Sequence, residues 1–218
     1  MQGHTLTDNV MCTVSSLLQD HIQASYHDSV ENGEYAVAPV LQILHWNTKQ
    51  HWITISNIGV RSTGVINVYD SKWYDDDIAL QNMLAGFLRC ATDKLTVNFM
   101  HVQHQSNNTD CGLFAVAFAN SLAFGQDPTA LRYSPVAIRR LLLQQLQDGM
   151  LQPFPSTVIP PHRPILRTKV LQLYCMCRMP DDGREMVQCD RCDSWYHVSC
   201  VGLDNTARDW YCNKCCVV

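Results

Sequence analysis

The chain has 218 residues, with 20 acidic and 16 basic side chains and a formal net charge of −4. This length allows two domains, and the small acidic excess argues against bulk binding of nucleic acid or of an anionic membrane surface. No stretch has the continuous apolar length of a membrane-spanning helix, so we expect a soluble chain without a membrane partner.

Hydrophobic spacing predicts a mixture of helices and strands over roughly the first 150 residues. The predicted helices lie at about 6–23, 77–90, 113–124 and 134–147. The predicted strands lie at 40–44, 52–58, 65–69 and 95–102. A turn from Gly59 to Gly64 joins the second and third strands, which indicates an antiparallel hairpin.

The composition changes after about residue 150. Only three of the chain's 11 cysteines precede this point, and eight follow it. The prolines between the two parts exclude a helix and favour an extended spacer. We therefore expect a first domain at 1–151, a Pro-rich linker at 152–172 and a Cys-rich domain at 173–216.

Eight metal-ligand side chains follow one another in the Cys-rich segment. They are Cys175, Cys177, Cys189, Cys192, His197, Cys200, Cys212 and Cys215. Thiolates and an imidazole at such short spacings are typical of closed tetrahedral sites, so we expect two structural Zn²⁺ ions. The alternative is a disulfide framework, which the polar segment Met1–Thr5 and the surplus of free cysteines disfavour. Cys216 is left over, either as a spare thiol or as a substitute for Cys215.

The sequence around these ligands resembles a PHD finger. The resemblance is carried by Cys-x-Cys, Cys-Asp-x-Cys, Trp-Tyr-His-x-x-Cys and Trp-Tyr-Cys-x-x-Cys, which begin at Cys175, Cys189, Trp195 and Trp210. It implies a cross-brace of two interleaved ligand sets. One set is Cys175, Cys177, His197 and Cys200, and the other is Cys189, Cys192, Cys212 and Cys215. It also makes Trp210 a core aromatic, and metal binding should stabilise so small a domain.

Three further residues match the cage of PHD fingers that read trimethyl-lysine: Tyr174, Met186 and Trp195. Aromatic faces attract a quaternary ammonium group, and a Met thioether packs softly against its methyl groups. The resemblance also places Asp190 against a histone arginine, and it implies a histone H3 tail as partner and a nuclear location. Acidic residues at 181–185 add negative charge beside this groove.

Each of these residues also has a purely structural interpretation. Tyr174 and Trp195 could only cover the zinc core, since aromatics beside zinc ligands often serve packing alone. The acidic pair Asp181-Asp182 could be a solvated turn. The sequence disfavours nucleic acid as a partner, because the basic side chains of this segment are interspersed with acids instead of forming a stripe.

In the first domain, Cys111 stands where a polar loop enters an apolar helix. Unpaired backbone N–H groups and the helix dipole favour a thiolate at such a position. Gly112 allows a close backbone approach. The other two cysteines of this domain, Cys12 and Cys90, are expected to be small core residues. Cys111 is therefore the candidate nucleophile.

A nucleophilic cysteine needs a base and a group that orients the base. In a hairpin centred near the Gly59-to-Gly64 turn, His51 falls within about two residues of Asp70 on the opposite strand. His45 would pair with Asp70 only if the turn lay inside an apolar alternating run. The sequence therefore favours His51 as the base and Asp70 as the orienting group.

This constellation resembles the ubiquitin-like-protein-specific (Ulp/SENP) cysteine proteases, which are related to the adenovirus protease. The matching residues are Leu6-Thr7-Asp8-Asn9-Val10, His51-Trp52, Tyr69-Asp70-Ser71, Gln105 and Asp110-Cys111-Gly112. The resemblance implies an α+β fold of the papain-like, adenain-like type. It makes Cys111 the nucleophile and Gln105, rather than the neighbouring Gln103, an oxyanion donor beside the Cys111 backbone N–H. Trp52 is expected to line the channel for the substrate.

The resemblance implies a cysteine protease, an isopeptidase or processing enzyme that cleaves after the Gly-Gly end of a ubiquitin-like modifier such as SUMO. The finger would direct it to chromatin by binding a methylated histone H3 tail. One alternative is a catalytically weak or inactive adaptor that binds a ubiquitin-like modifier and a histone tail. Another is a peptidase acting on a viral or mobile-element polyprotein.

Overall fold

The computed structural model of the chain describes residues 6–31, 39–88, 91–203 and 209–216. These residues form two compact units. The first unit comprises Met1–Asp75 and Val97–Lys169, and the second comprises Asp76–Thr96 and Val170–Val218. The predicted segment Met1–Thr5 and the predicted core residue Cys90 lie outside the described residues.

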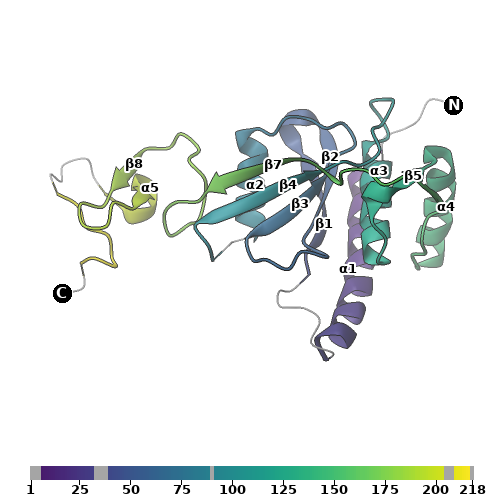
Figure 1. Cartoon of the computed structure of the whole chain (residues 1–218), viewed down its shortest axis with the longest axis horizontal. Coiled ribbons are helices and arrows are strands. Elements are labelled where there is room, and N and C mark those ends of the chain that lie inside the picture. The colour runs from purple at the N-terminus through teal and green to yellow at the C-terminus, as the bar shows by residue number, and fades with distance from the viewer. Residues whose placement is uncertain (1–5, 32–38, 89–90, 204–208, 217–218) are drawn as a thin grey trace. The chain divides into compact units, whose positions relative to one another are not determined.

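All four predicted helices are present, and a short fifth helix lies in the Cys-rich segment (Figure 1). The helices are α1 (Asp8–Glu31), α2 (Ile78–Leu88), α3 (Cys111–Ala123), α4 (Pro135–Asp148) and α5 (Val198–Val201). Two 3₁₀ turns, η1 (Asn47–Lys49) and η2 (Pro128–Ala130), join other elements. In the part of the chain that the structure describes, no helix is both long and apolar enough to cross a membrane.

The strands form one five-stranded sheet and two small ribbons (Figure 1). The five-stranded sheet has the order β1 (Leu41–Trp46), β2 (His51–Ser56), β3 (Val65–Tyr69), β4 (Lys94–Met100) and β7 (Ile165–Gln172). The ribbons pair β5 (Leu131–Tyr133) with β6 (Ser156–Val158) and β8 (Met186–Gln188) with β9 (Trp195–His197). The hairpin expected around Gly59 is confirmed, since β2 and β3 are antiparallel neighbours.

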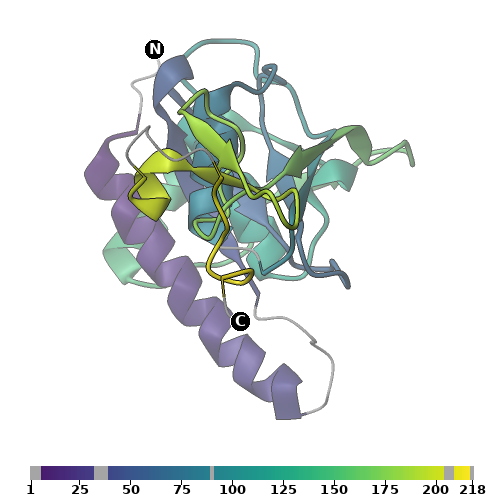
Figure 2. The same ribbon diagram turned by 90° about the vertical axis from the view of Figure 1, so that its left-hand side faces the viewer.

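Helix α3 is the centre of the first unit's core. Its sequence is almost wholly apolar, and every residue from Cys111 to Leu122 is buried. It packs against β1 and β2 and against α1, the long purple helix in Figure 2. The hydroxyl of Thr54 in β2 donates to the carbonyl of Ala115 over 2.7 Å, which ties the helix to the sheet. Cys12 is exposed on α1, so its expected place in the core is wrong.

The segment 152–172, predicted to be an extended spacer, instead contributes two strands. Its first residues are held by the buried Asn120 of α3, which accepts from the N–H of Phe154 and donates to the carbonyl of Gln152, both over 3.1 Å. Strand β6 then pairs with β5, and β7 joins the five-stranded sheet. The prolines exclude helix here, but they do not prevent strand pairing on either side of them.

Candidate functional site: two cysteine-histidine clusters and a buried cysteine-histidine-aspartate set

The Cys-rich segment folds around tight turns that bring ligand pairs together. Backbone N–H groups of Arg178, Asp193 and Cys215 bond to the carbonyls of Cys175, Cys189 and Cys212. Cys175 and Asp193 adopt φ angles of 62° and 57°, the left-handed conformation that tight turns require. Each turn thus directs two closely spaced ligands toward one point.

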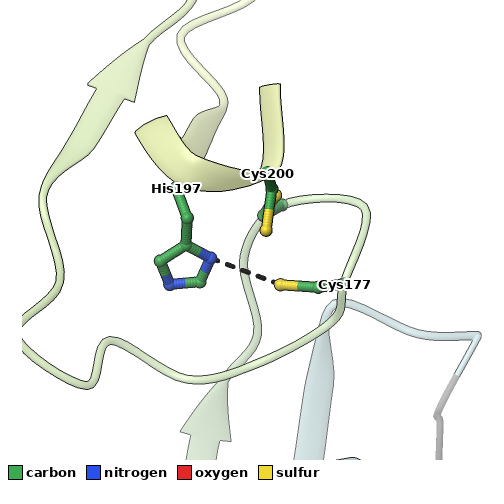
Figure 3. A group of neighbouring side chains, drawn as sticks. Cys177, His197 and Cys200 are labelled. Carbon is green, nitrogen blue, oxygen red and sulfur yellow. Dashed lines mark hydrogen bonds between the residues drawn. The ribbon is translucent and has the colours of Figure 1, made fainter. Parts of the chain in front are cut away.

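The first cluster contains Cys175, Cys177, His197 and Cys200. Its ligand atoms all lie within 4.8 Å of one another, and Nδ1 of His197 lies 3.3 Å from Sγ of Cys177 (Figure 3). His197 is fully buried, and this burial lowers the pKa of its imidazole. The ring is therefore neutral at pH 7, as a metal ligand must be.

The second cluster contains Cys189, Cys192, Cys212 and Cys215, again with all ligand atoms within 4.8 Å. The backbone N–H of Cys212 donates to Sγ of Cys189 over 3.3 Å. The thiol of the leftover Cys216 is exposed and donates to the carbonyl of Tyr211, so it takes no part in the cluster. Four soft or imidazole ligands at such separations fit tetrahedral zinc. The two interleaved clusters are those expected, and they hold two structural zinc ions.

Two of the three predicted cage residues lie on the β8–β9 ribbon, and the third lies next to it in the chain path. In its register Met186 faces His197 and Gln188 faces Trp195, so the side chains of Met186 and Trp195 share a face of the ribbon. Tyr174 is brought alongside because the N–H of Cys175 donates to the carbonyl of Trp195 over 3.0 Å.

The packing of the aromatic residues distinguishes Trp195 from its neighbours. Tyr196 points to the opposite face of the ribbon and meets Trp210, with ring centroids 5.2 Å apart. Those two aromatics provide the packing, as expected of Trp210. Trp195 is 43% exposed.

The acidic residues near the ribbon divide into two kinds. Asp190 is exposed, and one of its carboxylate oxygens accepts from the backbone N–H of Trp210 over 2.7 Å. Asp181 is also exposed and caps a local turn at Gly183. Asp182 differs, because its side chain is only 13% exposed and faces His197. Its carboxylate also accepts from the backbone N–H of Arg184, and no motif of the sequence indicates its inward position.

In the first unit, the structure brings His51, Asp70 and Cys111 together. His51 begins β2, Asp70 follows β3, and Cys111 begins α3. Nε2 of His51 lies 2.7 Å from Oδ1 of Asp70, and all three residues are buried. The carboxylate of Asp70 also accepts from the backbone N–H groups of Lys72 and Tyr74, which hold its orientation.

The charges of this set are coupled. Burial alone lowers the pKa of His51, but hydrogen bonds with Asp70 and Cys111 more than offset it and raise the pKa to about 9. Burial alone raises the pKa of the Cys111 thiol, but hydrogen bonds with His51 and with the backbone of Trp52 bring it below its usual value. The imidazole is thus held in its charged form beside an acidic thiol.

The remaining residues predicted for a hydrolytic site contact neighbouring residues of the same chain. Gln105 is 1% exposed, and its amide accepts from Ser71 and donates to the carbonyl of Asn107. Trp52 is half-buried and packs against the ring of His45 at 4.7 Å. The space above Gly112 is filled by Leu6, whose Cβ would lie 3.3 Å from an added Cβ.

Comparison with known proteins matches the Cys-rich segment. Residues 175–215 match the PHD-finger family model. Transcription initiation factor TFIID subunit 3 of Xenopus laevis is 48% identical over 42 residues, 18% of this chain and 5% of that protein. The Set1 complex component spp1 of Schizosaccharomyces pombe is 28% identical over 119 residues, 53% of this chain and 24% of that protein. The COMPASS component SPP1 of Saccharomyces cerevisiae is 37% identical over 62 residues, 26% of this chain and 18% of that protein. The matched region thus spans less than a quarter of each of these relatives.

The prediction of a cysteine peptidase is contradicted by these relatives. They are named as components of TFIID, Set1 and COMPASS complexes, and none is named as a peptidase. The comparisons likewise give no support to a papain-like protease fold or to a SUMO-like substrate. The first unit is a mixed α/β domain with a buried Cys111–His51–Asp70 set.

The family match and the geometry of the clusters agree over the same residues. All eight predicted ligands fall within 175–215, and they form two interleaved four-residue groups. The chain therefore contains a zinc-binding PHD finger at residues 175–215.

Proposed function

We propose that this protein is a nuclear chromatin adaptor whose PHD finger binds a histone H3 tail through a methylated lysine. The observation that carries the proposal is the position of Tyr174, Met186 and Trp195 beside the zinc clusters, with Trp195 exposed on the ribbon face that also bears Met186. Relatives named as parts of transcription and Set1 complexes support a role on chromatin.

The ribbon offers a place for an extended peptide. Among the described residues, β8 pairs with β9 alone, so the outer edge of β8 presents backbone N–H and C=O groups to solvent. An extended tail adds to such an edge as a third strand, and the main-chain hydrogen bonds supply sequence-independent affinity. Side chains of the tail then alternate between the two faces of the ribbon.

The cage supplies specificity for methylation. A methylated ammonium group on the face of Met186 and Trp195 meets an indole face and a thioether, with Tyr174 alongside. The aromatic quadrupoles attract its charge, and the apolar surface favours methyl groups over a strongly hydrated primary ammonium. Asp190 is exposed, and the carboxylate oxygen that does not bond to Trp210 would accept from an arginine of the same tail.

Binding of a trimethylated H3 peptide should depend on Trp195. A desolvated cation–π contact contributes about 2 kcal/mol, so Trp195→Ala should weaken binding roughly tenfold or more. Calorimetric titration of the zinc-loaded chain measures this change. Tyr211→Ala is the matched control, because Tyr211 is also an aromatic of the finger and is 45% exposed, against 43% for Trp195.

The zinc content of both variants should equal that of the wild type, which shows that the finger is folded. Unchanged affinity in Trp195→Ala, or an equal loss in both variants, would contradict the proposed cage.

A further inference from the structure

We infer that Asp182, held in place by Arg184, is the outer partner that orients the zinc ligand His197. This assignment concerns the metal site and does not depend on what the finger binds. It rests on an unpartnered buried nitrogen of His197, on the position of the Asp182 carboxylate, and on the contacts that hold that carboxylate.

The two ring nitrogens of His197 have different surroundings. Nδ1 points toward Sγ of Cys177, with Cys200 close by, and is the nitrogen directed at the ion (Figure 3). Nε2 points away from these sulfurs, is buried, and has no hydrogen-bond partner among the described residues. A neutral imidazole that ligates through Nδ1 carries its hydrogen on Nε2. The ring therefore buries an N–H donor that needs an acceptor.

Asp182 supplies a carboxylate to this donor. Its Oδ1 lies 3.8 Å from Nε2 of His197, and its side chain is largely buried although the neighbouring Asp181 and Gly183 are exposed. A movement of about 1 Å brings these atoms to hydrogen-bonding distance. Ligating histidines commonly donate their second ring nitrogen to a carboxylate, which fixes both the tautomer and the orientation of the ring.

Arg184 holds the Asp182 carboxylate in this position. Its Nε lies 2.9 and 2.8 Å from the two carboxylate oxygens, and its backbone N–H donates to Oδ1 over 3.2 Å. The loop is also tied to the residue after the ligand, because the N–H of Val198 donates to the carbonyl of Glu185 over 3.0 Å. The carboxylate and the imidazole thus belong to one connected piece of structure.

Asp181 provides a matched control for Asp182. The two residues are adjacent and carry the same charge. Asp181, however, is exposed, and among the described residues its side chain accepts from the backbone N–H of Gly183 alone, over 3.0 Å. A general effect of negative charge on zinc affinity would appear in variants of both residues, whereas an effect of orientation would appear at Asp182 alone.

The test measures zinc release from the full-length, zinc-loaded chain to a competing chromogenic chelator. Loss of an outer partner typically weakens metal binding 10–100-fold. Asp182→Ala should therefore lower the zinc affinity of the site that contains His197 by roughly that factor. The zinc affinity of the other site, which has four cysteine ligands, should not change. Asp182→Asn keeps an acceptor but loses the charge, and should lie between the wild type and Asp182→Ala. Asp181→Ala should behave as the wild type.

Nitrogen NMR of the His197 ring gives a second readout. The hydrogen on Nε2 should be resolved in the wild type and in Asp181→Ala, and it should exchange faster with water in Asp182→Ala. Arg184→Gln covers the case in which Asp182→Ala fails to fold, since it leaves the carboxylate and removes its clamp. Arg184→Gln should lower the zinc affinity of the same site.

The inference is overturned if Asp182→Ala releases zinc as slowly as Asp181→Ala. It is equally overturned if Asp182→Ala loses both ions while Asp182→Asn and Arg184→Gln keep both at wild-type affinity, because that pattern marks general unfolding.

Discussion

The imidazole of His51 lies between the carboxylate of Asp70 and the thiol of Cys111, and these neighbours decide its charge. Despite burial, its pKa is raised to about 9. The Cys111 thiol is shifted in the opposite sense, to a pKa below 9.0. Two interacting groups of this kind titrate as a pair, so each is best examined after the other has been removed.

The two groups contribute to stability with opposite dependence on pH. The contribution of His51 is complete below its unfolded pKa of 6.5 and is lost as the pH rises through about 9. The contribution of Cys111, whose folded pKa is lowered, is present above 9.0 and is lost as the pH falls through that folded pKa. In the pH range where both contributions change, the loss of the His51 contribution offsets the gain of the Cys111 contribution in the wild type.

Cys111→Ala should therefore expose the His51 contribution. Its free energy of unfolding should fall more steeply than that of the wild type as the pH rises from 6.5 to the folded pKa of His51. In this variant that pKa lies below about 9, because the contribution of Cys111 to it is lost. Denaturant titrations across this range measure the difference, and Cys12→Ala is the control, because Cys12 is an exposed cysteine in the same unit. A steeper fall in the wild type, or an NMR pKa of His51 near 6.5 in the wild type, would contradict the assigned coupling.

Residue pairings were predictable where strand register determines them. The turn between β2 and β3 places His51 near Asp70, and counting from that turn was enough to predict their contact. Asp182 was not predictable in this way. Its burial depends on the path of an irregular loop past His197, and an acidic pair in such a loop reads from sequence as solvated.

Among the elements, the amide of Asn120 joins α3 to the segment that follows α4, and the amide of Gln145 joins α4 to the same segment. Asn120 is 1% exposed and bonds to the backbone of both Gln152 and Phe154. Asn120→Ala leaves the backbone N–H of the buried Phe154 without its acceptor, whereas the carbonyl of Gln152 still accepts from Gln145. The unsatisfied N–H should cost about 1–3 kcal/mol of unfolding free energy. Chemical denaturation measures this loss, and Gln144→Ala, at an exposed position of α4, should change stability by less than about 0.5 kcal/mol. Equal stability of the two variants would contradict the role of Asn120.

Most elements of the first unit were predictable because their apolar residues recur at the spacing of a helix or a strand. Helix α3 is the clearest example, with an apolar run that follows a polar loop. Strand β7 escaped prediction. Its residues are mostly exposed or half-buried, so they show little hydrophobic pattern, and the prolines before it indicated a spacer. Pairing with β4 across a long sequence separation is a tertiary effect that a local pattern does not contain.

At the scale of the whole molecule, the finger and the first unit differ in how far motifs determine function. Eight ligands at fixed spacings admit few structures, and the clusters, the family match and the relatives agree on a zinc-binding PHD finger. The motifs of the first unit are short, and their residues His51, Asp70 and Cys111 lie close together in the structure. Their geometry alone nevertheless did not establish a peptidase, and the named relatives contradict one.

The most direct test of the proposed function is a calorimetric titration of the zinc-loaded wild-type chain with H3 tail peptides that differ at one lysine. The peptides carry an unmodified lysine, a trimethyl-lysine, or a neutral analogue in which a tert-butyl group replaces the trimethylammonium. The cage predicts the tightest binding for the trimethylated peptide, because only this side chain combines methyl surface with positive charge. Removal of zinc should abolish the difference. Equal affinity for the unmodified and trimethylated peptides would contradict the account.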